Sequence, residues 1–145
     1  MFICKRYVEK TAGLKLKVKR LLKFYFCVDS LERAINGMIA AKAAASWVSA
    51  GGGMSCAEDI LKYTQEKDEL SALWNYLDGV ICSLKKDEAA ILENYALMRC
   101  GIARLCDERR KEIKRAAMKF RRRAHRLLDF SGALALVGKY YCLLR

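Results

Sequence analysis

The side chains with the most evident chemistry are lysines and arginines gathered in the last third of the chain. Residues 104–126 contain eleven basic side chains against three acidic ones, a local net charge of +8. On a helix over residues 107–128, with about 100° per residue, most of these charges separate from an apolar face. The apolar face consists of Ile113, Ala116, Ala117, Phe120, Ala124, Leu127 and Leu128, and the opposite, cationic face of Lys111, Arg115, Met118, Lys119, Arg122 and Arg126.

This cationic face indicates a polyanionic partner. Exposed helix faces usually mix signs at i,i+4 spacing, because opposite charges attract and like charges repel, and here only Glu112 lies near the edge. The whole chain has 28 basic against 16 acidic residues and a net charge of +12, which favours an anionic partner. We expect double-stranded DNA, because the planar fork of arginine suits phosphates and guanine edges. RNA stays open, as does a plain solvated face. The alternative function is a non-enzymatic helical protein that binds an acidic protein or an anionic membrane surface.

The segments around the basic helix predict a helix-turn-helix, in which the second helix of the pair lies in the major groove and the first crosses the backbone. The alternative is one long helix over residues 88–128, kinked near Gly101. For the helix-turn-helix we expect, in order, a helix over Asp87–Met98, a short helix over Ile102–Cys106, a tight turn at Asp107–Arg109 and the basic helix, which Asp107 caps and which runs to about Leu128.

A pattern of apolar residues links these segments, with eleven residues from Ile102 to Ile113. The other members of the pattern are Leu84, Ile91, Leu92, Tyr95, Ala103, Ala117 and Ala124. With this pattern, residues 84–128 resemble region four of sigma factors and the ArpU-like phage late-transcription regulators. The resemblance implies a small transcriptional regulator of phage or mobile-element type, with RNA polymerase or a second copy as further partners. It places Arg109, Arg110, Lys111, Lys114 and Arg115 in the groove, while the charge pattern places Lys119, Arg122 and Arg126 along phosphates.

Nothing in the sequence motivates an enzyme, a cofactor or a metal site. His125 is the one histidine, and its neighbours offer neither a nucleophile nor an orienting carboxylate. Residues 51–53 are three glycines, but the Gly-Lys-Ser/Thr of a phosphate-binding loop does not follow them. Seven cysteines are spread without a C-x-x-C pair, which predicts free, buried thiols in a reducing cytoplasm rather than disulfides or zinc.

The elements that must position the basic helix are predicted to be helical throughout. We expect a single all-α domain over residues 1–145, a compact bundle of five to seven helices, because the chain lacks proline and its apolar residues recur at three and four. Its parts are basic and alanine-rich helices over 1–50, a glycine-rich loop over 51–55 and the helix-turn-helix-like segment 84–128. Helix caps are expected at Asp29-Ser30, Ser55 and Asp87, and a core stripe at Leu70, Leu73, Trp74, Leu77, Ile81 and Leu84.

The two ends of the chain allow fewer conclusions. The basic N-terminal segment has three open interpretations, namely a second phosphate contact, an amphipathic helix on a membrane surface, or a core helix whose lysines extend to solvent. Its charges are Lys15, Lys17, Lys19, Arg20 and Lys23. At the other end, Ser131-Gly132 should end the basic helix, and a short apolar helix should follow. The run Phe130–Leu144 contains Lys139 and is too short to cross a bilayer.

Overall fold

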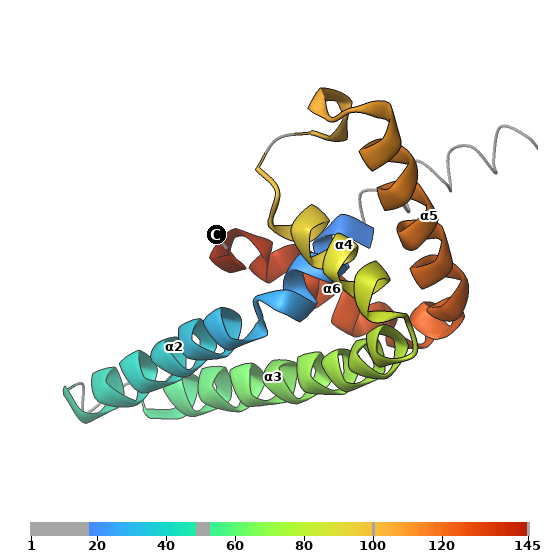
Figure 1. The fold of residues 1–145 in the computed structure, drawn as a ribbon. Coiled ribbons are helices and arrows are strands. Elements are labelled where there is room, and N and C mark those ends of the chain that lie inside the picture. The colour runs from blue at the N-terminus through green and yellow to red at the C-terminus, as the bar shows by residue number, and fades with distance from the viewer. Residues whose placement is uncertain (1–17, 49–52, 100, 145) are drawn as a thin grey trace, which may run out of the picture.

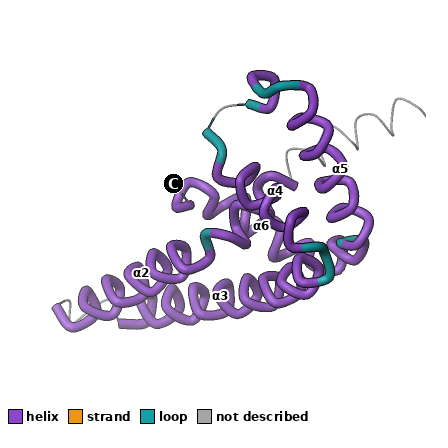
Figure 2. The backbone as a smooth tube through the Cα atoms, in the orientation of Figure 1, coloured by secondary structure: helices purple, strands orange, loops and turns teal. Residues whose placement is uncertain are grey.

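The computed structural model describes residues 18–48, 53–99 and 101–144, and it confirms the all-α prediction (Figures 1 and 2). The described residues form six α-helical segments, within the predicted five to seven, and contain no strand. The segments are residues 18–26, α2 (Val28–Val48), α3 (Gly53–Cys82), α4 (Lys86–Leu97), α5 (Asp107–Arg123) and α6 (Ser131–Tyr140). Three 3-10 helices join or follow them: η1 (Ile102–Arg104), η2 (His125–Phe130) and η3 (Tyr141–Leu144).

The longest helix, α3, organises the molecule. Its 30 residues span about 45 Å, and α2 runs beside it as an elongated pair (Figure 1). Residues 18–26, α4 and α6 gather around the C-terminal half of α3 (Figure 1). Helix α5 runs along the outer edge of this group, against α4 and α3 (Figure 1). The basic helix therefore has one side on the bundle and one side free of it.

The core follows the predicted helical spacing. In the expected stripe on α3 and just beyond it, Leu70, Leu73, Leu77, Ile81 and Leu84 are all buried. Other elements complete the core through Leu22, Phe24, Leu31, Ile35, Leu92, Ala116, Phe120 and Val137. A single apolar cluster joins these residues, so segments far apart in the sequence fold as one unit.

Trp74 is the exception in the predicted stripe, because it is only half-buried. Its ring stacks on Tyr25 at a centroid distance of 5.3 Å, and its indole Nε1 donates to the Tyr25 carbonyl at 3.0 Å. A tryptophan needs a partner for its N–H group, and the edge of the core supplies one. The side chain of Trp47 lies outside the described residues.

The predicted helix caps are wrong, because each predicted cap residue lies inside the first turn of its helix. The helices α2 and α3 begin at Val28 and Gly53, ahead of Asp29-Ser30 and Ser55, so residues 53–55 of the predicted glycine-rich loop are helical. Residues 51–52 lie outside the described residues. The N-caps of α4 and α5 are Lys85 and Cys106, neither of which makes a side-chain cap hydrogen bond. The acidic residues stand instead in the first turns, where a negative charge is stabilised by the helix dipole.

The basic helix is shorter than predicted. It ends at Arg123, and Ala124 departs from helical backbone angles with φ −88° and ψ 36°. The chain continues as the 3-10 helix η2, and this change of winding turns Leu128 outward, where it is 85% exposed. Leu128 therefore does not belong to the buried face of α5. Ser131 begins α6, which is the short apolar helix expected after the basic one.

The run His125–Leu144 is long and apolar enough for a membrane span by length and composition, with a mean hydropathy of 1.3. In the structure this run is divided into η2, α6 and η3, and the ten residues of α6 span about 15 Å, half of a bilayer core of about 30 Å. Ala133, Val137, Tyr140 and Leu144 from this run are buried in the core. In all, 22% of the most apolar window of this run is buried inside the protein.

The thiols are free but mostly exposed. Four cysteines have side chains that the structure describes, and all four are free. Cys82, Cys106 and Cys142 are exposed and Cys27 is half-buried, so the prediction of buried thiols is wrong for the first three. They occupy helix ends and the outer side of η3, which the core stripe does not reach.

A buried polar group ties α3 to α6. The carboxylate of Glu66 is 8% exposed and accepts hydrogen bonds from the Tyr140 hydroxyl and, at 3.1 Å, from Lys139 Nζ. Burial alone would raise the pKa of Glu66, but these hydrogen bonds and the charges of Lys139 and Lys62 outweigh it and hold the pKa below the ordinary 4.5. Burial and the contact with Glu66 raise the pKa of Tyr140. The network is therefore most stable with Glu66 ionised.

Truncation of a core leucine on α3 tests the packing. Leu73→Ala should lower the free energy of unfolding by about 2–5 kcal/mol, because it leaves a cavity at a fully buried position. Leu61→Ala on the same helix is the matched control, since Leu61 is 59% exposed, and should change the free energy by about 0.5 kcal/mol or less. Urea denaturation measures both, and equal losses would contradict this core.

The pH dependence of stability tests the Glu66 network. Because the pKa of Glu66 is lower in the folded state, its contribution is present above the ordinary pKa of 4.5 and is lost as the pH falls through the folded value. Glu66→Gln should therefore flatten the fall in unfolding free energy below about pH 4.5. Urea titrations at several pH values measure this slope. Glu58→Gln, at an exposed position of α3, is the control, and identical slopes for the Glu66 variant and the wild type would refute the role of the network.

Candidate nucleic-acid interface

The inner face of α5 anchors the basic helix to the bundle. Ile113, Ala116, Phe120 and Ala124 are buried, as the helical periodicity predicts. Ala117 and Leu127 are half-buried at the margin of this face. Small residues beside one large ring let α5 approach α4 and α3 closely. The direction of the opposite side chains is therefore fixed by the packing of the helix.

Five basic residues form what we call the outer basic face. They are exposed, and none of them makes an ion pair with a carboxylate of the described residues. Met118 lies among them and is 51% exposed. The outer basic face consists of Lys111, Lys114, Arg115, Arg122 and Arg126. Helical geometry puts Lys111, Lys114, Arg115 and Arg122 outside the buried face of α5, and Arg126 follows on η2, where it is exposed.

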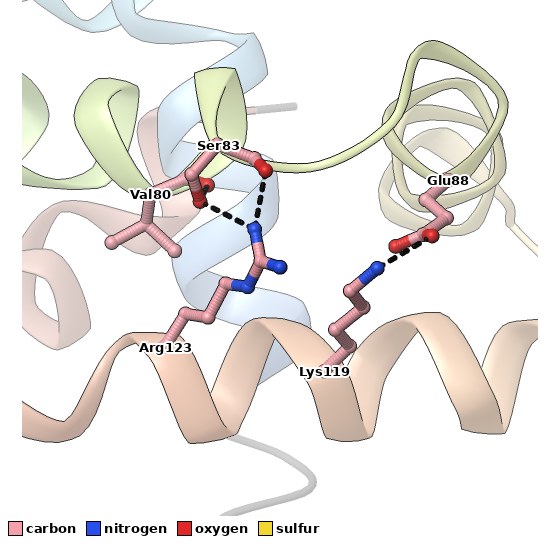
Figure 3. Close-up of polar contacts among 5 residues, drawn as sticks. All are labelled: Val80, Ser83, Glu88, Lys119 and Arg123. Atoms are coloured by element: carbon pink, nitrogen blue, oxygen red, sulfur yellow. Dashed lines mark hydrogen bonds and ion pairs between the residues drawn. The ribbon is translucent and has the colours of Figure 1, made fainter.

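Lys119 does not belong to this face, although the sequence pattern predicts a phosphate contact there. Its Nζ lies 2.8 Å from Glu88 Oε1 on α4, on the side of α5 that faces the bundle (Figure 3). The other carboxylate oxygen of Glu88 is buried and has no hydrogen-bond partner among the described residues. Lys119 thus compensates a carboxylate that solvent reaches poorly, and the phosphate contact predicted for Lys119 stays a prediction.

Arg123 makes the second of two side-chain contacts that hold α5 on the bundle, which we call latches. The first latch is the ion pair of Lys119 with Glu88, and the second joins α5 to the end of α3. Its guanidinium donates to the Ser83 carbonyl and, at 3.0 Å, to the Ser83 hydroxyl (Figure 3). The Ser83 hydroxyl in turn donates to the Val80 carbonyl at 2.5 Å. Carbonyls at a helix C-terminus lack intrahelical partners, and a basic side chain satisfies them. The sequence gives no sign of this contact, because Ser83 and Arg123 are 40 residues apart.

The first turns of α5 hold the remaining predicted site residues. Arg110 pairs with Asp107 at the surface, and a pair of this kind contributes about 0–1 kcal/mol. Arg109 is exposed and lines a small cavity between α4 and α5 that also contains Tyr95 and Glu112. These two arginines therefore stand beside the outer basic face rather than on it.

The connection between α4 and α5 excludes one of the two predicted arrangements. The alternative of one kinked helix over 88–128 is wrong, because α4 ends at Leu97 and α5 begins at Asp107. Extended backbone interrupts the helix, with ψ of 154° at Gly101 and 157° at Cys106. The predicted short helix over Ile102–Cys106 is a single 3-10 turn, Ile102–Arg104. The turn predicted at Asp107–Arg109 is wrong, since those residues form the first turn of α5.

The basic N-terminal segment is a core helix over residues 18–26. Leu21, Leu22 and Phe24 are buried, which confirms the core-helix interpretation and contradicts the membrane-surface one for these residues. Its charged groups lie over aromatic rings, which is a favourable cation–π geometry. Lys19 Nζ is 5.4 Å from the centroid of Tyr95, and Arg20 and Lys23 lie 5.2 and 5.3 Å from that of Tyr141. Lys15 and Lys17 lie outside the described residues.

His125 lies just beyond the end of α5, beside Arg122 and Arg123. His125 is exposed, and it lines a shallow depression with Arg122, Arg123 and Ser83 that contains no carboxylate. No group of three histidine, cysteine, aspartate or glutamate side chains within these ranges could hold a metal ion. The chemistry that the site offers is the binding of anions.

A double-mutant cycle tests the latch between Lys119 and Glu88. Lys119→Ala should lower the free energy of unfolding by about 1–3 kcal/mol, because it leaves a poorly solvated carboxylate unpaired. Lys119→Ala with Glu88→Ala should cost less than the sum of the single changes, with a coupling of about 0.5–1 kcal/mol. Lys114→Ala, at an exposed position of the same helix, is the control and should be nearly neutral. Strict additivity in denaturant titrations would contradict the latch.

The chain was compared with known proteins at three levels. No protein-family model matches it, and neither a curated protein nor a solved structure is similar to it. The relation of residues 84–128 to sigma-factor region four and the ArpU-like regulators stays a prediction. The function has to be argued from the geometry and charge of the chain itself.

Proposed function

We propose that this protein is a non-enzymatic, double-stranded-DNA-binding protein that places α5 against the duplex and acts as a small transcriptional regulator. The observation that carries the proposal is the outer basic face, five exposed cations with no carboxylate partner among the described residues. Cations that have no carboxylate partner within the protein can neutralise the phosphates of a nucleic acid. The counterions that the phosphates then release contribute to the affinity.

The shape of α5 supports the same partner. A helix with its side chains is about 10–12 Å wide, and the major groove is about 12 Å wide. The 17 residues of α5 span about 25 Å, and the helix lies along the edge of the molecule (Figure 1). From Lys111 to Arg115 the axial rise is about 6 Å, and from Arg115 to Arg122 about 10.5 Å. The cations are thus spread along the helix rather than concentrated at one point.

We assign the contacts by position along α5. The first turns, with Arg109, Arg110, Lys111, Lys114 and Arg115, would enter the major groove, as the second helix of a helix-turn-helix does. Arg122 and Arg126 would lie along phosphates. The surface pair of Arg110 with Asp107 is weak enough to be exchanged for a phosphate.

Duplex DNA is favoured over single-stranded RNA by the absence of aromatic rings on the outer basic face. Recognition of single-stranded RNA stacks bases on exposed aromatic side chains. In the described ranges, Tyr25 stacks on Trp74, Tyr140 is buried, and Tyr141 lies under Arg20 and Lys23. As a transcriptional regulator in the cytoplasm, the protein would also bind RNA polymerase or a second copy of its own chain.

A charge-matched pair of triple variants tests the proposal. Lys111→Ala, Arg115→Ala and Arg122→Ala together should weaken binding to duplex DNA of any sequence. The slope of log affinity against log salt should also fall, by about 0.9 for the phosphate contact assigned to Arg122 and by up to about 2.7 where Lys111 and Arg115 also neutralise phosphates. Fluorescence anisotropy with a labelled duplex at several salt concentrations measures both quantities.

The control removes three cations elsewhere, with Arg33→Ala, Lys62→Ala and Lys67→Ala on α2 and α3. It makes the same change in net charge and should leave the salt slope near that of the wild type. Equal effects of the two triple variants would show that overall charge, and not the outer basic face, drives binding. Tighter binding to anionic vesicles than to duplex DNA would instead support the alternative, a protein that docks on an acidic surface.

A further inference from the structure

An apolar groove lies on the flank of α5, beside the outer basic face. Its volume is about 250 Å³, and four elements line it, namely residues 18–26, α4, η1 and α5. The lining residues that matter here are of two kinds. The apolar ones are Val18, Ile102, Ile113, Ala117 and Met118, and the cations are Lys19, Lys114 and Arg121.

The combination of apolar lining and one sign of charge distinguishes this groove. No acidic residue of the described ranges lines it, whereas the cavity on the other side of the α4–α5 contact contains Glu112 beside Arg109. The remaining polar group in the groove is Tyr95, and burial raises the pKa of its hydroxyl, which stays a neutral donor. The groove therefore presents donors and positive charge, but no carboxylate that would repel an anion.

The cations come from two elements. Lys19 belongs to residues 18–26, where its Nζ lies 5.4 Å from the centroid of the Tyr95 ring. Lys114 and Arg121 are seven residues apart on α5, an axial rise of about 10.5 Å. The α5 side of the groove therefore has a cation near each of its two ends, and either cation can pair with the charged head of a ligand. The apolar part of that ligand would contact Ile102, Ile113 and Met118.

We infer that this groove binds a single-chain anionic amphiphile of the fatty-acid class. The alkyl chain lies on the apolar lining, and the carboxylate head pairs with Lys19, Lys114 or Arg121. Burial of apolar surface supplies the affinity, and the cations select the sign of the head group.

Other occupants fit the charges less well. A second copy that approached through the same cationic region would be repelled. Residues 1–17 carry five basic side chains against one acidic. The cations of the groove would therefore also repel this segment as an occupant. A duplex carries charge but no apolar chain for the groove. The inference does not rest on DNA binding.

Titration with matched amphiphiles tests the head-group preference. Isothermal titration calorimetry of the full chain with dodecanoate, below its micelle-forming concentration and at low salt, should show saturable binding with one site. Dodecan-1-ol should bind at least about fivefold more weakly, since it lacks the charge that the cations attract, and dodecyltrimethylammonium should bind more weakly still. Equal affinity for the anion and the cation, or heat only above the micelle-forming concentration, would overturn the inference.

A pair of substitutions to aspartate locates the site. Met118→Asp adds a carboxylate to the groove at a position that is 51% exposed, so it should fold and should weaken dodecanoate binding at least tenfold. Leu128→Asp is the control, since Leu128 is 85% exposed and lies outside the groove, and it should bind as the wild type does.

Two further results complete the test. Lys19→Ala with Arg121→Ala should remove most of the preference for dodecanoate over dodecan-1-ol. Wild-type affinity in Met118→Asp would place the ligand elsewhere and refute the groove. A wild-type chain that binds dodecanoate but not duplex DNA would retain this inference and reject the proposed function, and the reverse result would do the opposite.

Discussion

Repulsion among the cations of α5 is the constraint that the rest of the structure has to satisfy. Like charges at i,i+4, such as Lys111 with Arg115 and Arg115 with Lys119, each disfavour a helix by about 0.2–0.5 kcal/mol. Burial of Phe120 contributes about 1.5–3 kcal/mol, and Ile113 and Ala116 add to it. The apolar face therefore outweighs the repulsion, but only while α5 stays packed on α4 and α3. The helix is maintained by its packing, and its charges are held where packing puts them.

The packing of α5 also gives the cations on its two sides different partners. Cations on the flank that faces the bundle are used internally, since Lys119 pairs with Glu88 and Arg123 satisfies the Ser83 carbonyl. Cations on the outside keep no carboxylate partner among the described residues. Sorting by direction explains how a strongly basic helix can be part of a stable core and still present a surface suited to polyanions. The two roles belong to different side chains of one helix.

The helical periodicity of the sequence predicted which residues of a single helix are buried. It did not predict contacts between residues of two different segments. The buried positions Leu73 and Phe120 follow from spacing alone, because a helix repeats every 3.6 residues. The partner of Lys119 lies 31 residues away, and no local pattern records it. The starts of α2, α4 and α5 were missed because an acidic residue in a first turn resembles a cap in the sequence. The end of α5 was missed because Leu127 and Leu128 continue the apolar pattern while the backbone changes to 3-10 winding at Ala124.

The groove and the outer basic face share Lys114, so occupants of the two sites would influence each other. An anionic head in the groove, about 8 Å from a DNA phosphate, would repel that phosphate by about 0.5 kcal/mol in water. This repulsion corresponds to about a twofold loss of affinity, and linkage requires that DNA weaken the amphiphile by the same factor. By charge alone, an occupied groove would therefore be a weak regulator of the proposed DNA binding. A strong effect would require the ligand to move α5, and the latches at Lys119 and Arg123 oppose that motion.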